Sequence, residues 1–290
     1  MNLHVSLSHN PIEHIAGAGG NCIDLVPGAR VQHNTVTNVF DGTQMETGLK
    51  GKTVLITGAS RNMGRLAAIA FARERANIAI CTSAKMKELS EVAAECRALG
   101  AKVVAEQCDV ADGASVKAFV DKVQAELGTV HVALNNAVYR VDSTPFLEVS
   151  EDAWEKSFRV NLGGPRNICR AVLPMMIKQR WGRIINFSGI DPLLGGSVVK
   201  GMAKLGIVGF TRGIAREFAE HEITANCIGP GTIDSEREKT LKPKLLRPTQ
   251  PIRRMGTSQE VVSLMLYLAS EDAGFVTGQN YLMNGGMYFQ

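Results

Sequence analysis

From Lys50 onward, short runs rich in β-branched residues alternate with amphipathic stretches of helical length. Such runs are typical of strands, and apolar positions spaced three and four residues apart are typical of helices. The runs predict strands at 53–57, 78–82, 102–107, 130–135, 183–187, 224–228 and 280–283. The stretches between them predict helices at about 63–75, 85–99, 114–127, 152–179, 198–220 and 258–269.

Regular alternation of strand and helix predicts crossover units, and therefore a parallel sheet with helices on both faces. The fold class that follows is α/β, a doubly wound arrangement around a seven-stranded parallel sheet. Gly100 and Gly128 stand where helices are expected to end. Thr257 and Glu260 have the spacing of a capping box at the start of the last helix. No internal repeat interrupts this pattern, so 49–290 is predicted to be one domain.

The first 48 residues differ from the rest of the chain. They are rich in Gly, Asn and Thr, and helical periodicity is hard to find in them. We interpret 1–48 as an arm that packs on the main domain or on a neighbouring subunit. The segment holds four of the six histidines, at positions 4, 9, 14 and 33. No cluster of Cys, His and Asp has metal-ligand spacing, so no metal site is predicted.

Composition narrows the class of protein. The chain has 290 residues, of which 45% are hydrophobic and 21% charged, which is ordinary for a globular protein. A net charge of +4 favours acidic partners only weakly, and no basic stripe indicates nucleic-acid binding. No apolar run reaches the roughly 18 residues of a membrane helix, and the N-terminus does not resemble a secretory signal. We expect a cytoplasmic protein that binds neither membranes nor nucleic acid.

Six cysteines are scattered along the chain, and no two of them form a C-x-x-C pair. We interpret them as reduced, mostly buried thiols rather than disulfides, as expected in the cytoplasm. They are Cys22, Cys81, Cys96, Cys108, Cys169 and Cys227.

The first predicted strand runs directly into a glycine-containing turn, Thr57–Arg65, where a helix begins. A strand, a glycine-rich turn and a helix in this order direct backbone N–H groups and the helix N-terminus at a phosphate. Gly58 permits the tight turn, and Gly64 permits the helix to pack closely on the sheet. The arrangement predicts a dinucleotide site.

The turn TGASRNMGR resembles the T-G-x-x-x-G-x-G turn of the short-chain dehydrogenases/reductases, and the resemblance continues through 50–290. Further matching motifs occur in the family's order: Cys108-Asp109-Val110, Asn135-Asn136-Ala137, Val160-Asn161, Gly229-Pro230-Gly231 and the closing Thr277-Gly278-Gln279 with Asn284-Gly285-Gly286. The resemblance implies a Rossmann fold and a nicotinamide cofactor. The residues it implies at the cofactor are Gly58, Ser60, Arg61, Asn62, Met63, Gly64, Asp109, Val110, Asn135, Ala137, Lys204, Gly231 and Ile233.

Charge at the end of the second strand indicates which cofactor is bound. An NAD site usually has an acidic residue there that binds the ribose 2′-hydroxyl. This strand ends in Cys81-Thr82-Ser83 without an acid, whereas Arg61 and Lys85 are available for a 2′-phosphate. We therefore expect NADP(H) rather than NAD(H). Asn62 replaces the middle glycine of the turn, which Asn tolerates because it adopts left-handed backbone more readily than other non-glycine residues.

The catalytic end departs from the family. The family's chemistry uses Ser, Tyr and Lys, with Asn from the preceding helix. Asn161 and Lys204 match this pattern, but Lys200 stands at the Tyr position and Gly189 at the Ser position, with Ser188 one residue early. In addition, Val138 replaces the glycine of N-N-A-G. The candidate catalytic residues are Asn161, Lys200, Lys204, Tyr139 and Ser188.

Three interpretations of these departures remain open: a redox enzyme with another proton donor, a non-redox enzyme (lyase, hydratase or isomerase), or a non-catalytic nucleotide-binding homologue. The run Lys200–Lys204 resembles the M-G-x-A-K run of enoyl-thioester reductases, which also lack that Tyr. Tyr139 is then a candidate donor or a pocket-wall aromatic. Lys200, one turn from Lys204, is expected to have a lowered pKa and to act as acid/base or Schiff base, or to bind a substrate carboxylate. Asp191 is expected as an alternative partner that neutralises the lysine pair.

The stretch 236–248, which the family uses as a substrate lid, is basic here, and Arg253 and Arg254 extend it. A basic lid favours an anionic substrate such as a carboxylate or a coenzyme A thioester; alternatively it is a solvated loop. The leading prediction is an NADP(H)-dependent oxidoreductase acting on a small, anionic carbonyl or conjugated-carbonyl compound.

Assembly is also predicted from the resemblance. The helices 152–179 and 198–220 resemble those through which family members associate, so we expect a homo-tetramer, with a dimer as the alternative. The apolar surface is expected from Val172, Met175, Met176, Val208 and Phe210.

Overall fold

A computed structural model describes residues 47–140, 144–235 and 250–289. All of them belong to one of the two units into which the chain divides, Met45–Gln290. Of the predicted arm 1–48, only residues 47 and 48 are described, and Cys22 lies outside the described residues. The boundary of the arm therefore stays a prediction.

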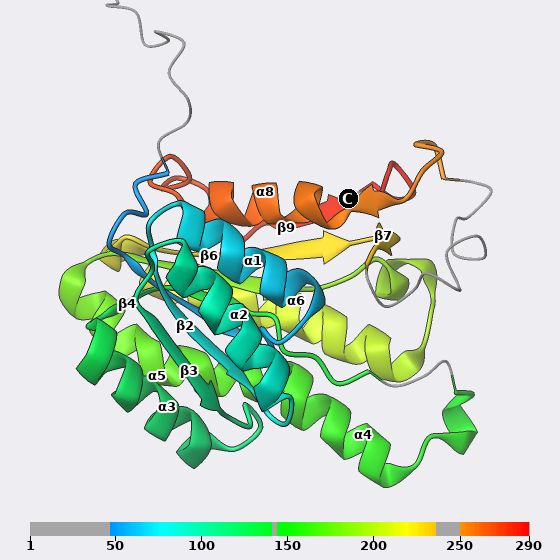
Figure 1. The fold of residues 1–290 in the computed structure, drawn as a ribbon. Helices are drawn as coiled ribbons and strands as arrows, with labels where there is room; N and C mark the ends of the chain where they lie inside the picture. The colour runs from blue at the N-terminus through cyan, green and yellow to red at the C-terminus, as the bar shows by residue number, and fades with distance from the viewer. Residues whose placement is uncertain (1–46, 141–143, 236–249, 290) are drawn as a thin grey trace, which may run out of the picture. The chain divides into compact units, whose positions relative to one another are not determined.

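The described residues form a seven-stranded parallel sheet in the order β3-β2-β1-β4-β5-β6-β9, which confirms the predicted fold class (Figure 1). Each predicted strand is present and shifted by no more than two residues at either end. The strands are β1 Thr53–Thr57, β2 Asn77–Thr82, β3 Val103–Gln107, β4 Val130–Asn135, β5 Gly182–Phe187, β6 Ile223–Pro230 and β9 Asn280–Met283. A small separate pair joins β7 Ile233–Asp234 to β8 Gly256–Thr257.

The helices cover both faces of the sheet, because each has one apolar side. Buried residues of α1, α2 and α8 pack on one face, and those of α3, α5 and α6 pack on the other (Figure 1). The helices are α1 Asn62–Arg73, α2 Met86–Ala98, α3 Gly113–Leu127, α4 Glu151–Phe158, α5 Gly164–Gln179, α6 Val198–Phe218 and α8 Ser258–Ala269. Short 3-10 turns lie at Phe146–Glu148, Asp191–Leu194 and Ala219–His221.

Helix ends follow the local sequence. The capping box is present: the Thr257 hydroxyl accepts from the Glu260 N–H, and the Glu260 carboxylate accepts from the Thr257 N–H. Gly128 is the C-cap of α3, and Gly100 follows the C-cap of α2, both with positive φ. The glycines thus end these helices as predicted.

The single helix predicted at 152–179 is wrong in one respect, because a π-helical turn, Arg159–Gly163, divides it into α4 and α5. Pro165 has no N–H, so it cannot donate the α-helical hydrogen bond to the carbonyl of Asn161 four residues earlier. The interruption therefore falls at one of the candidate catalytic residues.

Candidate active site

The carboxyl ends of β1, β4, β5 and β6 meet at one edge of the sheet. The chain order reverses between β1 and β4, which are neighbours in the sheet. Ligands of doubly wound proteins bind at such a switch point. Thr57, Asn135, Phe187 and Pro230 end these strands, and most candidate residues follow directly after them.

Two glycines of the turn after β1 are required by close packing. Gly58 has a φ of +66°, and a Cβ there would lie 2.9 Å from the Cα of Ala137. A Cβ on Gly64 would lie 2.5 Å from the Gly58 carbonyl oxygen. No side chain fits at either position, so the tight turn and the close helix approach expected for them are both present.

The turn is tied to the end of β4 by hydrogen bonds. The Asn136 amide donates to the carbonyl oxygens of Thr57 (2.9 Å) and Gly58 (3.0 Å). The Ala137 N–H donates to the Thr57 hydroxyl at 3.0 Å. Sequence reasoning passed over Asn136, although the second Asn of the N-N-A motif marked it.

The turn leaves polar groups without partners. Asn62 has a φ of +50°, as its expected tolerance of left-handed backbone implies. Its Oδ1 is buried and has no hydrogen-bond partner among the described residues. The Arg61 side chain makes no capping hydrogen bond at the start of α1, so the first N–H groups of the helix remain unsatisfied by a cap. A dinucleotide, with phosphate acceptors and ribose hydroxyl donors, fits this combination of groups.

The end of β2 lies beside the glycine turn, since the Ala59 N–H donates to the Cys81 carbonyl at 3.1 Å. The residue that follows the strand by one position, Ser83, is exposed, and no carboxylate stands there. Lys85 pairs with Glu88 at 3.2 Å, whereas Arg61 is exposed at the turn.

The segment after β3 is shaped by local contacts. The Asp109 carboxylate accepts from the Ala111 N–H at 2.9 Å. Val110 is buried, and its carbonyl accepts from the Asn167 amide of α5 at 2.9 Å. The start of α5 approaches closely, because a Cβ on Gly164 would lie 2.8 Å from the Val110 side chain. Asp109 and Val110 thus have a fixed position near the sheet edge.

Lys204 belongs to α6, and its side chain reaches the carboxyl end of β5. Its ammonium group donates to the Phe187 carbonyl oxygen at 2.7 Å. Burial, opposed by the Cys227 thiol and aided by the positive charge of Lys200, lowers the pKa of Lys204 to about 8. Lys200 and Lys204 therefore interact electrostatically, as their spacing predicts. The side chain of Asp191 lies outside the described residues.

Gly189 stands where the family has its catalytic Ser, and the space beside it is empty of protein atoms. A Cβ on Gly189 would meet no atom within 4 Å. The neighbouring Ser188 is buried, and its hydroxyl donates to the Asn280 side chain of β9. Its N–H donates to the Ile228 carbonyl at 2.9 Å. These bonds join Ser188 to β6 and β9.

Asn161 binds the backbone of Tyr139 in both directions. Its Oδ1 accepts from the Tyr139 N–H at 3.0 Å, and its Nδ2 donates to the Tyr139 carbonyl at 2.9 Å. Nδ2 also lies 3.1 Å from the Ser157 hydroxyl. The Lys156 ammonium lies 5.0 Å from the centre of the Tyr139 ring. Asn161 thereby fixes Tyr139 beside α4.

A buried polar network lies beneath the site and was not predicted. The Asn135 amide donates to Asn186 (2.8 Å), and the Asn186 amide donates to the Thr211 hydroxyl (2.8 Å), which contacts the Cys227 thiol at 3.1 Å. These bonds join β4, β5, β6 and α6. Asn135, an expected cofactor residue, takes part in this network, and its Oδ1 has no partner in the described part of the chain.

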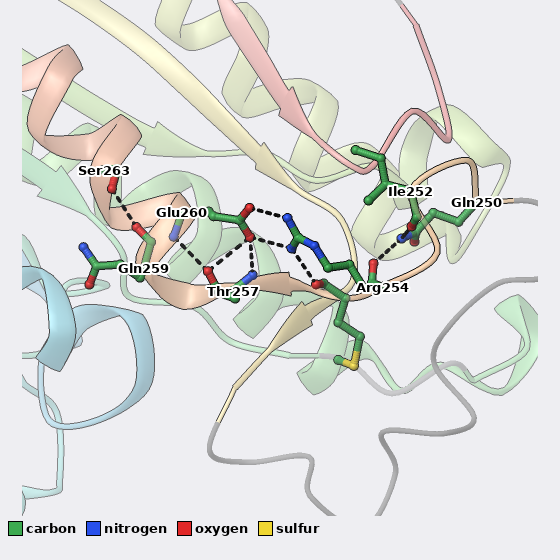
Figure 2. A network of polar contacts seen from close by, with 8 residues as sticks. Gln250, Ile252, Arg254, Thr257, Gln259, Glu260 and Ser263 are labelled. Atoms are coloured by element: carbon green, nitrogen blue, oxygen red, sulfur yellow. Dashed lines mark hydrogen bonds and ion pairs between the residues drawn. The ribbon is translucent and has the colours of Figure 1, made fainter.

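A cleft of about 360 Å³ lies near β7, β8 and the chain end, and Figure 2 shows the polar contacts at its border. Arg254 forms a two-pronged ion pair with Glu260, at 2.7 and 2.9 Å. The Gln250 amide donates to the carbonyls of Ile252 and Arg254. Arg254 therefore already has an acidic partner, and the expectation that it adds positive charge for an anionic substrate stays a prediction. The basic stretch 236–248 lies outside the described residues.

Other features of the described residues limit the site's chemistry. Among residues 47–140, 144–235 and 250–289, no group of three or more His, Cys, Asp or Glu side chains could hold a metal ion. No helix in the same ranges is long and apolar enough to cross a membrane. The five described cysteines are free and buried.

Comparisons with known proteins agree with this geometry. The family model described as enoyl-(acyl carrier protein) reductase matches residues 58–288. The 3-oxoacyl-[acyl-carrier-protein] reductase FabG of Staphylococcus epidermidis is 34% identical over 242 residues, covering 82% of this chain and 99% of that protein. The FabG of Chlamydia muridarum is 36% identical over 248 residues, covering 84% and 100%.

Among solved structures, a short-chain type dehydrogenase/reductase from Mycobacterium marinum superposes with a TM-score of 0.77 at 29% identity. The match covers 83% of this chain and 97% of that one. The chain belongs to the short-chain dehydrogenase/reductase family of oxidoreductases.

Proposed function

We propose that the protein is an NADP(H)-dependent oxidoreductase that acts on a small, anionic carbonyl or conjugated-carbonyl compound through an atypical active site. The observation that carries this proposal is the contrast at one sheet edge. The glycine turn has the close contacts that a dinucleotide turn requires, and the Lys204 side chain reaches the carboxyl end of β5. The family's catalytic Ser and Tyr are absent, because Gly189 and Lys200 stand at their positions.

The residues at the turn suit a dinucleotide. The unsatisfied start of α1 would hold the phosphates, and Arg61 would pair with a 2′-phosphate, since no carboxylate follows β2. The bound cofactor supplies or accepts a hydride. Lys204 is expected to hold the nicotinamide ribose, and Gly231 and Ile233 are expected to line the same pocket. Ser60, Met63 and Ala137 are also expected to contact the cofactor.

Proton transfer at the substrate oxygen requires a donor other than Ser or Tyr at their usual positions. Lys200 stands at the Tyr position and shares a helix face with Lys204. Two neighbouring cations favour an anionic substrate and stabilise negative charge that develops on its oxygen. Tyr139, fixed by Asn161, is the alternative donor.

One observation favours a second candidate, non-redox catalysis on the same scaffold. A lysine with a pKa of about 8 is partly neutral near physiological pH, and a neutral amine can act as general base or nucleophile. A lyase, hydratase or isomerase in which Lys204 does this would not need the missing Tyr. The third candidate is a protein that binds nucleotide without catalysis. The experiment below distinguishes the leading candidate from the other two.

The test is direct. The purified protein is titrated with NADPH and with NADH by fluorescence, and then assayed with a panel of 2-oxo and 3-oxo acids, their thioesters and enoyl thioesters. We expect tighter NADPH binding and oxidation of NADPH by an anionic member of the panel. Binding without oxidation on any substrate would favour the second or third candidate, and no nucleotide binding would exclude the leading one.

Assembly and location are further proposals. Val172 and Met176 are fully buried against the protein's own sheet, so the expectation that they supply subunit surface is wrong. The exposed apolar side chains of α6 are Val198, Met202 and Leu205. We propose a homo-tetramer that covers them, with a dimer as the alternative; a monomeric mass by light scattering would contradict this. Free thiols at all five described cysteines support a cytoplasmic location.

A further inference from the structure

Two cysteines lie on neighbouring strands under the nucleotide end of the sheet. Cys81 belongs to β2, and Cys108 directly follows β3. The Cys108 N–H donates to the Thr82 carbonyl at 2.9 Å, which continues the pairing of the two strands. Cys81 is 0% exposed and Cys108 is 2% exposed, and both belong to the apolar cluster on the α3 and α5 face. Their side chains therefore leave the sheet on the same face.

The two thiols also interact with each other. The neighbouring thiol is the largest influence on each: Cys108 raises the pKa of Cys81, and Cys81 lowers the pKa of Cys108. The Ser115 hydroxyl further lowers the pKa of Cys108. The thiolate is the form of cysteine that reacts with oxidants, so Cys108 is expected to react first. Cys81 is then the cysteine that forms the disulfide with it.

The pair is joined by the backbone to both segments that we propose for the nucleotide. The Cys81 carbonyl accepts from Ala59 of the glycine turn, and Cys108 precedes Asp109 and Val110. In the strand register Cys81 lies opposite Glu106, two residues before Cys108. A disulfide holds its Cα atoms within about 7 Å, and the two-residue offset in register means that closing one here is expected to draw Cys108 toward β2. Asp109 and Val110 are expected to move with it.

We propose that Cys81 and Cys108 form a reversible disulfide on oxidation by hydrogen peroxide, and that this disulfide weakens nucleotide binding. The second part rests on the proposed nucleotide site. The Cys108 thiolate attacks one peroxide oxygen, the O–O bond breaks, and hydroxide leaves and takes a proton to become water. The Cys81 thiol, losing its proton, then attacks the sulfur of the Cys108 sulfenic acid, and a second water leaves as the S–S bond forms.

Two of the other described cysteines, Cys96 and Cys169, differ from this pair and provide controls. Burial raises the pKa of Cys96, on α2, to about 11, and that of Cys169, on α5, to about 12. In the described part of the chain, neither is hydrogen-bonded to another thiol. Both are expected to react slowly with peroxide, because little thiolate is present. Cys96→Ser is the matched control for Cys108→Ser, since both replace a buried thiol by a hydroxyl.

The experiment uses the full-length protein. Reduced protein is treated with hydrogen peroxide, the remaining thiols are alkylated, and peptides are mapped by mass spectrometry before and after dithiothreitol. NADPH affinity is measured on reduced and oxidised samples, with thermal melting to confirm that both are folded. We expect a Cys81–Cys108 linked peptide and NADPH binding at least about tenfold weaker in the oxidised protein, because displaced contacts remove binding free energy.

Dithiothreitol is expected to restore the affinity, the Cys96→Ser protein to behave like the wild type, and Cys108→Ser to keep its affinity in peroxide. Saturating NADPH is expected to slow the oxidation. Oxidation of other cysteines first, absence of the linked peptide, or a linked peptide with unchanged affinity would each overturn the proposal. Reduced protein that fails to bind NADPH contradicts the proposed function instead, while the linked peptide still tests the disulfide separately.

Discussion

The two halves of the candidate site obey different constraints. At the nucleotide end, backbone geometry dominates: Gly58 and Gly64 are required by contacts under 3 Å, and Asn136 ties the turn to β4. At the catalytic end, side chains dominate, and nothing within 4 Å constrains a Cβ at Gly189. A scaffold can therefore keep its nucleotide end while the residue at the Ser position changes, since nothing packs against that position.

The largest effect that would sharpen this comparison is expected from Lys200→Ala. If Lys200 transfers the proton, the substitution lowers kcat and kcat/KM by about 10²–10⁴-fold, the usual contribution of a general acid or base. NADPH affinity, measured by fluorescence titration, is expected to change little. Lys117→Ala, at an exposed position of α3, is the control. A raised KM with unchanged kcat would instead show that Lys200 binds a substrate anion.

Arg61→Ala tests the nucleotide end. Loss of a charged contact of about 1.5–3 kcal/mol weakens NADPH binding by roughly ten- to a hundredfold and leaves NADH binding nearly unchanged. Lys85→Ala is expected to have a much smaller effect, because Lys85 already pairs with Glu88. Equal losses for NADPH and NADH in the Arg61 variant would refute the assignment to NADP(H).

The pH dependence of kcat/KM tests what Lys204 does. Its pKa is lowered to about 8 by burial, so it loses its charge as pH rises through that value. If the ammonium form holds the cofactor, kcat/KM falls by about tenfold per pH unit well above pH 8, as for any single required proton. A profile that rises through pH 8 would show that the neutral amine acts, which is the non-redox alternative. Initial rates between pH 6 and 10 distinguish the two.

A double substitution, Gly189→Ser with Lys200→Tyr, tests whether the catalytic end can be restored. Open space at Gly189 means that stability is expected to change by no more than about 0.5 kcal/mol for that substitution, measured by urea unfolding. Turnover of simple carbonyl substrates with NADPH is expected to exceed that of either single variant. If the double variant is folded, binds NADPH and stays no better than Lys200→Tyr alone, then residues besides these two define the site.

The smallest expected effect belongs to Asn62. Asn62→Gly relieves the cost of left-handed backbone, which is of order 1 kcal/mol, and removes a side chain beside the proposed phosphate position. NADPH affinity is expected to fall severalfold by fluorescence titration, because the buried Asn62 Oδ1 proposed to accept from the nucleotide is lost. Asn62→Ala, which keeps the cost of left-handed backbone, is the comparison. A higher affinity in Asn62→Gly would show that the Asn62 side chain crowds the nucleotide instead.

Local sequence was enough wherever a structural requirement is itself local. The strands 130–135 and 280–283 were predicted to the residue, and the capping box formed as its spacing implied. The glycine turn was recognisable because tight turns and close approaches need residues without a Cβ. The alternation of strand and helix then determined the layers and the parallel sheet.

Only the tertiary structure decided which partners distant residues have. Ser188 bonds Asn280, 92 positions away, and this contact weakens its candidacy for catalysis. Val172 and Met176 face the protein's own core, which depends on how α5 lies on the sheet. The lowered pKa of Lys204 follows from burial beside β5, which no spacing along one helix reveals. The order of apolar, polar and glycine residues along the chain indicates backbone conformation. The burial of a charged group and the pairing of distant side chains arise only when helices and strands pack together.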